Sequence, residues 1–321
     1  MRTIVRVLVF CIAIFTGGSA GAQNYPNHPV RMVVGFTAGG PTDVIARIVA
    51  EKLSASLGQQ FYVENKPGSG SNIASAEVAK APPDGYTLTV VSTGFMVNMS
   101  LYASVPYDAV KDFAPVTMVA FSPNVITVNP SVPAKNVKEL IALIKANLGK
   151  YSFAGPGIGS TPHLSGELFK QIFGLDMVHV PFPGAAQAVQ STVGGHTQIA
   201  FTALPSALAN IKDGKLRALA LLAVGRSTEL PDVPTMQEAG YLDQEADTLT
   251  GVLTPAGTPK EIVNLLQREI AKAVAQPDVT SNLLKLGFVP VADKPEVFGA
   301  RIKSEIAKWG KVVHEAHLRI E

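Results

Sequence analysis

The 321 residues carry 27 Lys+Arg against 25 Asp+Glu, a formal net charge of +2, and include a single cysteine. This near-neutral balance, without a basic cluster, argues against nucleic acid or an anionic membrane surface as the main partner. One cysteine excludes a disulfide scaffold and a metal site built from cysteines.

Residues 1–22 are predicted to be a signal peptide. Arg2 and Arg6 precede an apolar run, residues 7–15, that is too short to span a bilayer, and Ala-Gly-Ala at 20–22 is typical of a signal-peptidase site. The cysteine, Cys11, lies inside this run. Removing the two arginines leaves 25 basic against 25 acidic side chains. We therefore expect a periplasmic, cysteine-free protein, whose length is typical of two domains.

Alternating strand and helix patterns follow. The predicted elements are strand 30–36, helix 41–57, strand 59–65, helix 71–81 and strand 87–92. Pro41 suits the first position of its helix and Gly58 suits the position after the last turn. This βαβαβ order predicts a parallel sheet with helices on both faces.

The same alternation restarts in the second half. The predicted elements are strand 124–130, helix 137–148, strand 151–155, helix 162–173, strand 177–180, a short helix near 185–193, strand 198–201, another short helix and strand 216–224. Residues 225–250 are interpreted as an irregular surface connection, and the tail from Pro259 is predicted to be almost wholly helical. Two halves with the same alternation indicate a two-domain α/β protein.

Two glycine-rich turns join a strand to a helix at corresponding places in the two halves. They are GFTAGGPTD at 35–43 and SFAGPGIGSTPHL at 152–164. Their glycines let a ligand approach the backbone, and the first helical N–H groups, which lack intrahelical partners, favour negative charge. Either turn alone is compatible with routine helix capping. The pair indicates one small anion held between two domains.

The turns lack the residues that nucleotide sites require. Neither contains the lysine of a Walker loop, and GPGIGS at 155–160 has serine where a dinucleotide fingerprint has its last glycine. The anion is therefore expected to be a carboxylate or another small oxyanion, held by amides and hydroxyls rather than by a lysine or a metal. No cofactor is expected.

The sequence shows no convincing catalytic constellation. A G-x-S-x-G match at 17–21 lies in the predicted signal peptide. His163 is interpreted as a polar cap or packing residue, and Asp43 as a carboxylate that caps its helix rather than a general base. His314 and His317 are interpreted as a solvated helix end rather than metal ligands. We therefore predict that the protein is not an enzyme.

Seven stretches carry a resemblance to a known family. They are GFTAGGPTDVIAR (35–47), YVENKPGSGSNIA (62–74), APPDGYTL (81–88), GPGIGSTPHLSGELF (155–169), KLRALAL (215–221), LPDVPTMQEAGY (230–241) and TPAGTPKEIV (254–263). In this order they resemble the Bug-type substrate-binding proteins of tripartite tricarboxylate transporters, over essentially the whole chain after the signal peptide. The resemblance implies an α/β, type II periplasmic binding protein fold, in which two α/β lobes joined by crossing strands close on a carboxylate.

The resemblance also implies how the chain is divided. Lobe 1 is expected to be discontinuous, with residues 24–122 and 226–321, and residues 123–225 are expected to form lobe 2. The C-terminal helices would then return to the first lobe.

Relatives hold one ligand carboxylate between the two turns, through backbone amides, hydroxyls and ordered water. The ligand-binding positions that match are Phe36, Thr37, Ala38, Gly39, Gly40, Asp43, Ser92, Thr93, Gly157, Ile158, Gly159, Ser160, Thr161, His163, Phe182, Pro183, Gly184, Thr202 and Ala203. Thr202 and Ala203 stand where many relatives have an acid or amide, and residues 248–259 lack an aromatic pair that is often found there. Both departures fall at the variable end of the expected pocket.

The predicted function is that of a monomeric periplasmic receptor, which delivers a small dicarboxylate or aromatic carboxylate to the membrane permease of a tripartite tricarboxylate transporter. The alternative is a secreted α/β hydrolase-like enzyme acting on a small oxyanion, which would need a nucleophile–base pair. A ligand-sensing domain of a transcription regulator can share this fold, but the signal peptide and the missing DNA-binding helices oppose it.

Overall fold

The computed structural model describes residues 25–242, 245–315 and 317–320. The predicted signal peptide lies outside these residues, so its removal stays a prediction. Among the described residues, no helix combines the length and apolar character needed to cross a membrane.

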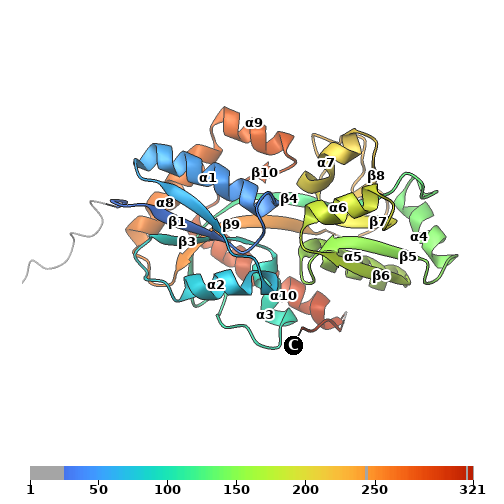
Figure 1. Cartoon of the computed structure of the whole chain (residues 1–321), viewed down its shortest axis with the longest axis horizontal. Coiled ribbons are helices and arrows are strands. Elements are labelled where there is room, and N and C mark those ends of the chain that lie inside the picture. The colour runs from blue at the N-terminus through green and yellow to red at the C-terminus, as the bar shows by residue number, and fades with distance from the viewer. Residues whose placement is uncertain (1–24, 243–244, 316, 321) are drawn as a thin grey trace, which may run out of the picture.

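The first half forms the predicted parallel sheet. Strand β1 (Val30–Val34) pairs in parallel with β2 (Phe61–Asn65) on one side and with β3 (Thr87–Ser92) on the other (Figure 1). Helix α1 (Pro41–Leu57) and helix α2 (Asn72–Ala79) are the crossovers that parallel pairing requires. Helix α1 begins at Pro41 and ends at Gly58 with φ 70°, as predicted from their positions.

One long strand joins the two halves. Strand β4 (Phe113–Val128) pairs antiparallel with β9 (Asp247–Pro255) as far as Pro123, and with β7 and β8 from Asn124 onward. A proline cannot donate to a sheet ladder, and Pro123 stands where the partners change. The short strand β10 (Val289–Pro290) also pairs with the first part of β4. Figure 1 shows β4 and β9 running through the middle of the molecule.

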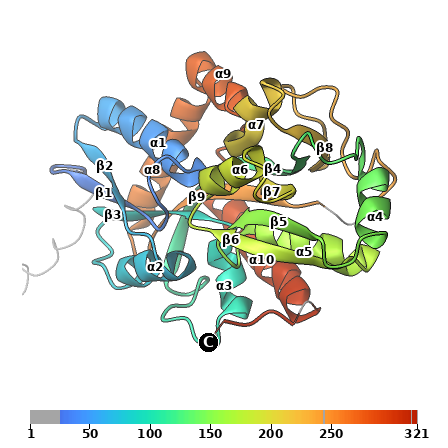
Figure 2. The same ribbon diagram turned by 45° about the vertical axis from the view of Figure 1, so that its right-hand side comes forward.

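The second half repeats the parallel arrangement. Strand β5 (Tyr151–Pro156) pairs in parallel with β6 (Met177–Phe182) and with β7 (Ile199–Ala203), and β8 (Arg217–Leu222) lies on the far side of β4. The connecting helices are α4 (Val137–Lys145), α5 (Thr161–Phe173), α6 (Ala185–Val193) and α7 (Leu204–Lys212). Figure 2 shows α5, α6 and α7 grouped around these strands.

The C-terminal helices pack mainly on the first half. Helix α8 (Lys260–Val274) lies against α1 and β4, and is followed by α9 (Pro277–Lys285). Helix α10 (Pro295–Glu315) lies against α3 (Gly94–Leu101) and β4. The far end of α10 reaches the second half, because Trp309 shares a buried cluster with Phe153 of β5 and Phe169 of α5.

Some elements were not predicted from the sequence. Helix α3 is buried along nearly its whole length, so it shows no polar face from which a helical stripe could be recognised. The first part of β4 contains Pro115 and Pro123, and proline is disfavoured inside a strand because it cannot donate to the ladder. The irregular connection predicted for 225–250 is too long by a few residues, because β9 begins at Asp247.

Candidate functional site

A cavity of about 510 Å³ lies where strands from both halves end. The carboxyl ends of β1, β3, β5, β6 and β7 meet there, as expected for ligand sites in α/β sheets. Helices α1, α2, α3, α5, α6 and α7 begin at the same place. Each contributes the partial positive charge of its N-terminus.

The structure brings most of the predicted site residues together around this cavity. Those that line it are Phe36, Thr37, Gly40, Ser92, Gly157, Ile158, Gly159, Ser160, Thr161, Pro183, Gly184 and Ala203. They come from both halves, so the two glycine-rich turns face the same space. The remaining predicted residues are not in the lining: Ala38, Gly39, Asp43, Thr93, His163, Phe182 and Thr202. Asp43, Thr93, His163 and Thr202 are buried behind it.

Asp43 supports the first turn rather than facing the cavity. Its carboxylate accepts hydrogen bonds from the Gly39 amide at 2.8 Å, from Arg47 Nε at 2.9 Å and from Asn65 Nδ2 at 2.8 Å. Burial alone would raise the pKa of Asp43, but the hydrogen bonds from these three residues outweigh it and hold the pKa below its usual value. The geometry agrees with capping and gives no support to a ligand contact.

His163 does the same for the second turn. Its Nδ1 accepts a hydrogen bond from the Gly159 amide at 3.1 Å, and its ring lies against His179 with centroids 4.1 Å apart. Burial, followed by His179 and Lys170, lowers the pKa of His163 to about 3. The imidazole is therefore neutral at physiological pH, and its acceptor nitrogen, Nδ1, is already hydrogen-bonded to the turn.

The two turns thus share one construction. Asp43 and His163 are each the third residue of a helix, and each accepts the amide hydrogen of a glycine four residues earlier. Both glycines, Gly39 with φ 80° and Gly159 with φ 85°, adopt the left-handed conformation that favours glycine. The shape of each turn is therefore fixed by its own helix.

The lining combines glycines, prolines and apolar side chains with a few hydroxyls, and carries no charge among the described residues. Of the described residues around the cavity, none is Lys, Arg, Asp, Glu or His. The Thr161 side chain is 2% exposed, and its Oγ1 has no hydrogen-bond partner within the described part of the chain. Ser160, the residue before Thr161, accepts a hydrogen bond from the His163 amide through its Oγ, at 3.3 Å. The site offers donors of helix termini and hydroxyls, which suit a carboxylate.

Metal binding finds no support in the same region. Nowhere in residues 25–242, 245–315 and 317–320 are three or more His, Cys, Asp or Glu side chains grouped so that they could hold a metal ion.

The sequence analysis missed several lining residues. They are mainly the turn between β2 and α2, the C-terminal part of α3 with the residue that follows it, and two residues from late in the chain: Pro67, Gly68, Gly70, Ser71, Asn98, Tyr102, Thr248 and Ile320. The turn was already visible in the stretch YVENKPGSGSNIA. Ile320 could not have been found, since it reaches the cavity by pairing with α3, where its amide donates to the Leu101 carbonyl at 2.9 Å.

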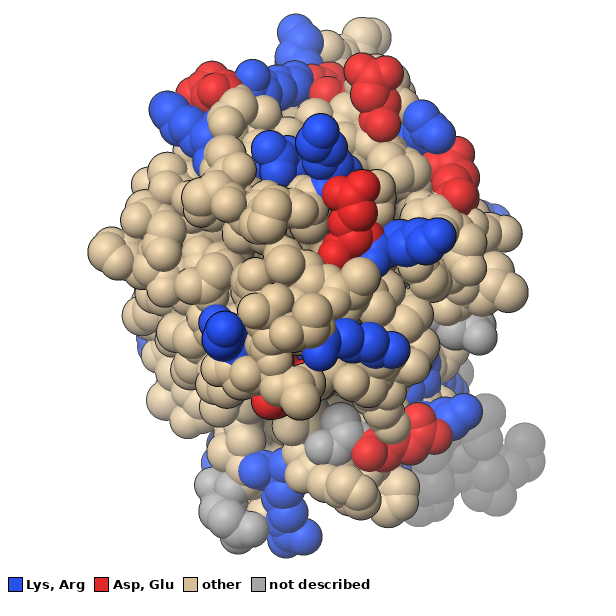
Figure 3. Space-filling model, turned by 90° about the vertical axis from the view of Figure 1, so that its right-hand side faces the viewer, with Lys and Arg blue, Asp and Glu red and all other residues tan. Residues whose placement is uncertain are grey.

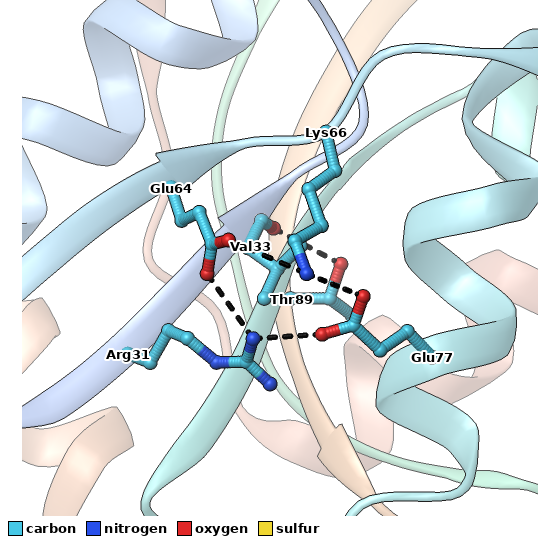
Figure 4. A network of polar contacts seen from close by, with 6 residues as sticks. All are labelled: Arg31, Val33, Glu64, Lys66, Glu77 and Thr89. Atoms are coloured by element: carbon cyan, nitrogen blue, oxygen red, sulfur yellow. Dashed lines mark hydrogen bonds and ion pairs between the residues drawn. The ribbon is translucent and has the colours of Figure 1, made fainter.

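Four charged side chains hold the start of the β2–α2 turn (Figure 4). Arg31 Nη1 lies 2.7 Å from Glu77 and 3.1 Å from Glu64, and Lys66 Nζ lies 2.6 Å from Glu77 and 3.3 Å from Glu64. Lys66 directly precedes Pro67, which lines the cavity. The network therefore ties strands β1 and β2 and helix α2 together where the turn begins.

Comparison with known proteins agrees with this geometry. Residues 45–318 match the family described as "Tripartite tricarboxylate transporter family receptor". The chain is 38% identical to Protein BugT of Bordetella pertussis over 322 residues, covering 100% of this chain and 99% of the relative.

Two similar proteins of known structure have carboxylate ligands. The R. palustris protein Rpa4515 with adipate is 34% identical, with a TM-score of 0.88 over 92% of this chain and 100% of its own. MatC from Rhodopseudomonas palustris with bound malate is 32% identical, with a TM-score of 0.84 over 90% of this chain and 100% of its own. The predicted family and the α/β, type II periplasmic binding protein fold are confirmed. This chain belongs to the receptor family of the tripartite tricarboxylate transporters.

Proposed function

We propose that this protein binds a small organic carboxylate, either a dicarboxylate or an aromatic carboxylate, in the cavity between two lobes. The observation that carries the proposal is the meeting of several helix N-termini around a cavity whose described lining includes no ionised side chain. Such a site stabilises one or two negative charges through amides and hydroxyls. The related structures with adipate and malate support the same class of ligand.

The proposal includes a division into lobes, with residues 24–122 and 226–321 in lobe 1 and residues 123–225 in lobe 2. The change of pairing partners at Pro123 supports the first boundary. It also includes removal of residues 1–22, a periplasmic location and delivery of the ligand, by a monomer, to permease subunits. Membership of a transporter receptor family supports delivery.

We further propose that the protein is not an enzyme. The two ionisable groups that hydrogen-bond to the turns, Asp43 and His163, are engaged by backbone amides and stand outside the lining. Neither is placed as the partner of a lining nucleophile, as the hydrolase alternative would require.

Calorimetry on the protein lacking residues 1–22 tests the binding proposal. We expect micromolar binding of at least one member of a panel containing adipate, malate, phthalate and benzoate, because three or four hydrogen bonds to a charged group can support such an affinity after the costs of association. Uncharged diols of matched length are the control. Tight binding of a diol, or no binding of any acid, would contradict the proposal.

A further inference from the structure

We propose that the turn between β2 and α2 is a third oxyanion-binding turn of this cavity, and that Ser71 is its ligand-contacting residue. The Ser71 hydroxyl donates a hydrogen bond to a carboxylate oxygen of the ligand. This inference rests on the proposed function and adds to it a contact from outside the two glycine-rich turns.

The first observation is a buried hydroxyl without a partner. Ser71 lines the cavity and is only 3% exposed, yet its Oγ makes no hydrogen bond to any of the described residues. Ser71 is the residue that precedes helix α2, but its side chain does not cap that helix. A buried hydroxyl that is hydrogen-bonded to neither water nor protein lowers the stability of the fold. Its presence at a ligand cavity therefore indicates a ligand contact.

The second observation is the backbone of the turn. Ser69, Gly70 and Ser71 have φ of 47°, 62° and 76°, the left-handed region that serine rarely adopts. Strain of this kind persists only where the surrounding structure imposes it, and it gathers at functional sites. The left-handed conformation of Ser71 turns its side chain toward the first glycine-rich turn.

Contacts from three elements hold Ser71 in this position. Gly35, the first residue of the first turn, allows a close approach: a Cβ at Gly35 would lie 2.2 Å from Ser71 Cβ. Asn98 of α3 is buried and donates from Nδ2 to the Gly70 carbonyl and to Asn72 Oδ1, both at 2.8 Å. The ion network around Lys66 fixes the other end of the turn (Figure 4).

The opposite wall carries a matching group. Thr161 Oγ1, at the start of α5, is the other lining hydroxyl that is buried and, within the described chain, unpartnered. Each of the two hydroxyls stands at the beginning of a helix, one in each half of the molecule. A carboxylate between them accepts a hydrogen bond from each half, and the positive ends of α2 and α5 add to its stabilisation.

The same turn offers a matched control. Ser69 is also a serine with positive φ, but it is exposed and does not line the cavity. Ser71→Ala and Ser69→Ala therefore remove the same group from the same backbone conformation. Only the first removes a hydroxyl from the cavity.

The test uses the tightest-binding acid from the panel of adipate, malate, phthalate and benzoate, with calorimetry and thermal unfolding of each variant. We expect Ser71→Ala to weaken binding about ten-fold or more, the usual effect of losing a hydrogen bond to a charged group. The ligand-free variant should melt at the same or a higher temperature, since an unpartnered polar group is removed. Ser69→Ala should leave the affinity unchanged.

Ser71→Gly is a second variant that tolerates the positive φ and so keeps the fold. It should lose affinity as Ser71→Ala does. Unchanged affinity of Ser71→Ala, or an equal loss in Ser69→Ala, would overturn the role of Ser71 while leaving carboxylate binding intact. If the parent protein binds none of the acids, the proposed function itself fails and this inference fails with it.

Discussion

At the scale of single residues, two glycines of the second turn have different roles. Gly159 is required by the fold: it has φ 85°, and a Cβ there would lie 2.2 Å from Leu101. A substitution of Gly159 therefore reports on strain as much as on the ligand. At Gly157 no atom lies within 4 Å of an added Cβ, so a side chain there projects into open space beside the cavity.

Gly157→Leu should block ligand binding without disturbing the fold. We expect calorimetry to show a loss of about 100-fold or more in affinity, equal to roughly 2.7 kcal/mol, with an unchanged melting temperature. Gly225→Leu is the control, because Gly225 also has free space around an added Cβ and lies away from the cavity. Normal affinity in a folded Gly157→Leu variant would exclude this wall of the cavity from ligand binding.

His163 should make stability depend on pH. Its pKa is about 3 in the folded protein and about 6.5 in an unfolded chain, so between these values only the unfolded state binds the extra proton. The contribution of His163 to the free energy of unfolding is therefore fully present above pH 6.5. It is lost as the pH falls toward 3, by up to about 1.4 kcal/mol per pH unit. His179, whose pKa burial and Lys170 lower to about 4, adds a similar loss.

His163→Gln keeps an acceptor for the Gly159 amide but cannot titrate. We therefore expect its free energy of unfolding to fall less steeply with decreasing pH than that of the parent protein. Urea unfolding between pH 7 and pH 5 measures this slope. Parallel slopes for His163→Gln and the parent would show that His163 is not the source.

At the scale of elements, helix α4 shows stabilisation that is independent of the site. Asn136, the N-cap residue, accepts the Glu139 amide at 2.9 Å, and Glu139 in turn accepts the amide of the preceding residue, Lys135, at 2.7 Å, a reciprocal arrangement similar to a capping box. Asn136→Ala should lower the free energy of unfolding by about 1 kcal/mol and leave ligand affinity unchanged. A change in affinity would mean that α4, which is remote from the lining, is coupled to the cavity.

The elements also show what a sequence can and cannot predict. Helix α1 was predicted because proline at its start and glycine after its last turn mark its ends locally, and α5 because a helical apolar pattern follows a proline. Strand β9 was missed because its partners, β3 and β4, lie more than a hundred residues away in the sequence. Ser71 was missed because its significance depends on contacts with Gly35 and α3, which no local pattern contains.

At the scale of the whole molecule, the two halves approach each other across the cavity. A Cβ on Gly184 of the second half would lie 3.5 Å from Thr37 Oγ1 of the first. A ligand that contacts both walls binds this arrangement better than one in which the walls are apart, so it shifts the population toward closure. Small-angle scattering should therefore show a smaller radius of gyration with ligand than without.

The Gly157→Leu variant supplies the control for closure, since added acid should not change its scattering. An unchanged radius for the parent protein at saturating acid would contradict ligand-driven closure, even if calorimetry shows binding.

The absence of ionised side chains from the described lining also bears on how quickly the ligand arrives. The attraction of an anion to a helix terminus fades within about one turn. Clustered lysines and arginines attract anions over longer distances, and dissolved salt screens this attraction. The chain has a formal net charge of +2, and Figure 3 shows that on the face at the α4 end, remote from the cavity, basic and acidic side chains are intermixed. Electrostatic steering should therefore be weak. We expect the association rate constant, measured by stopped flow, to change less than about two-fold between 20 mM and 500 mM NaCl. A fall of ten-fold or more would reveal a guiding charge outside the cavity.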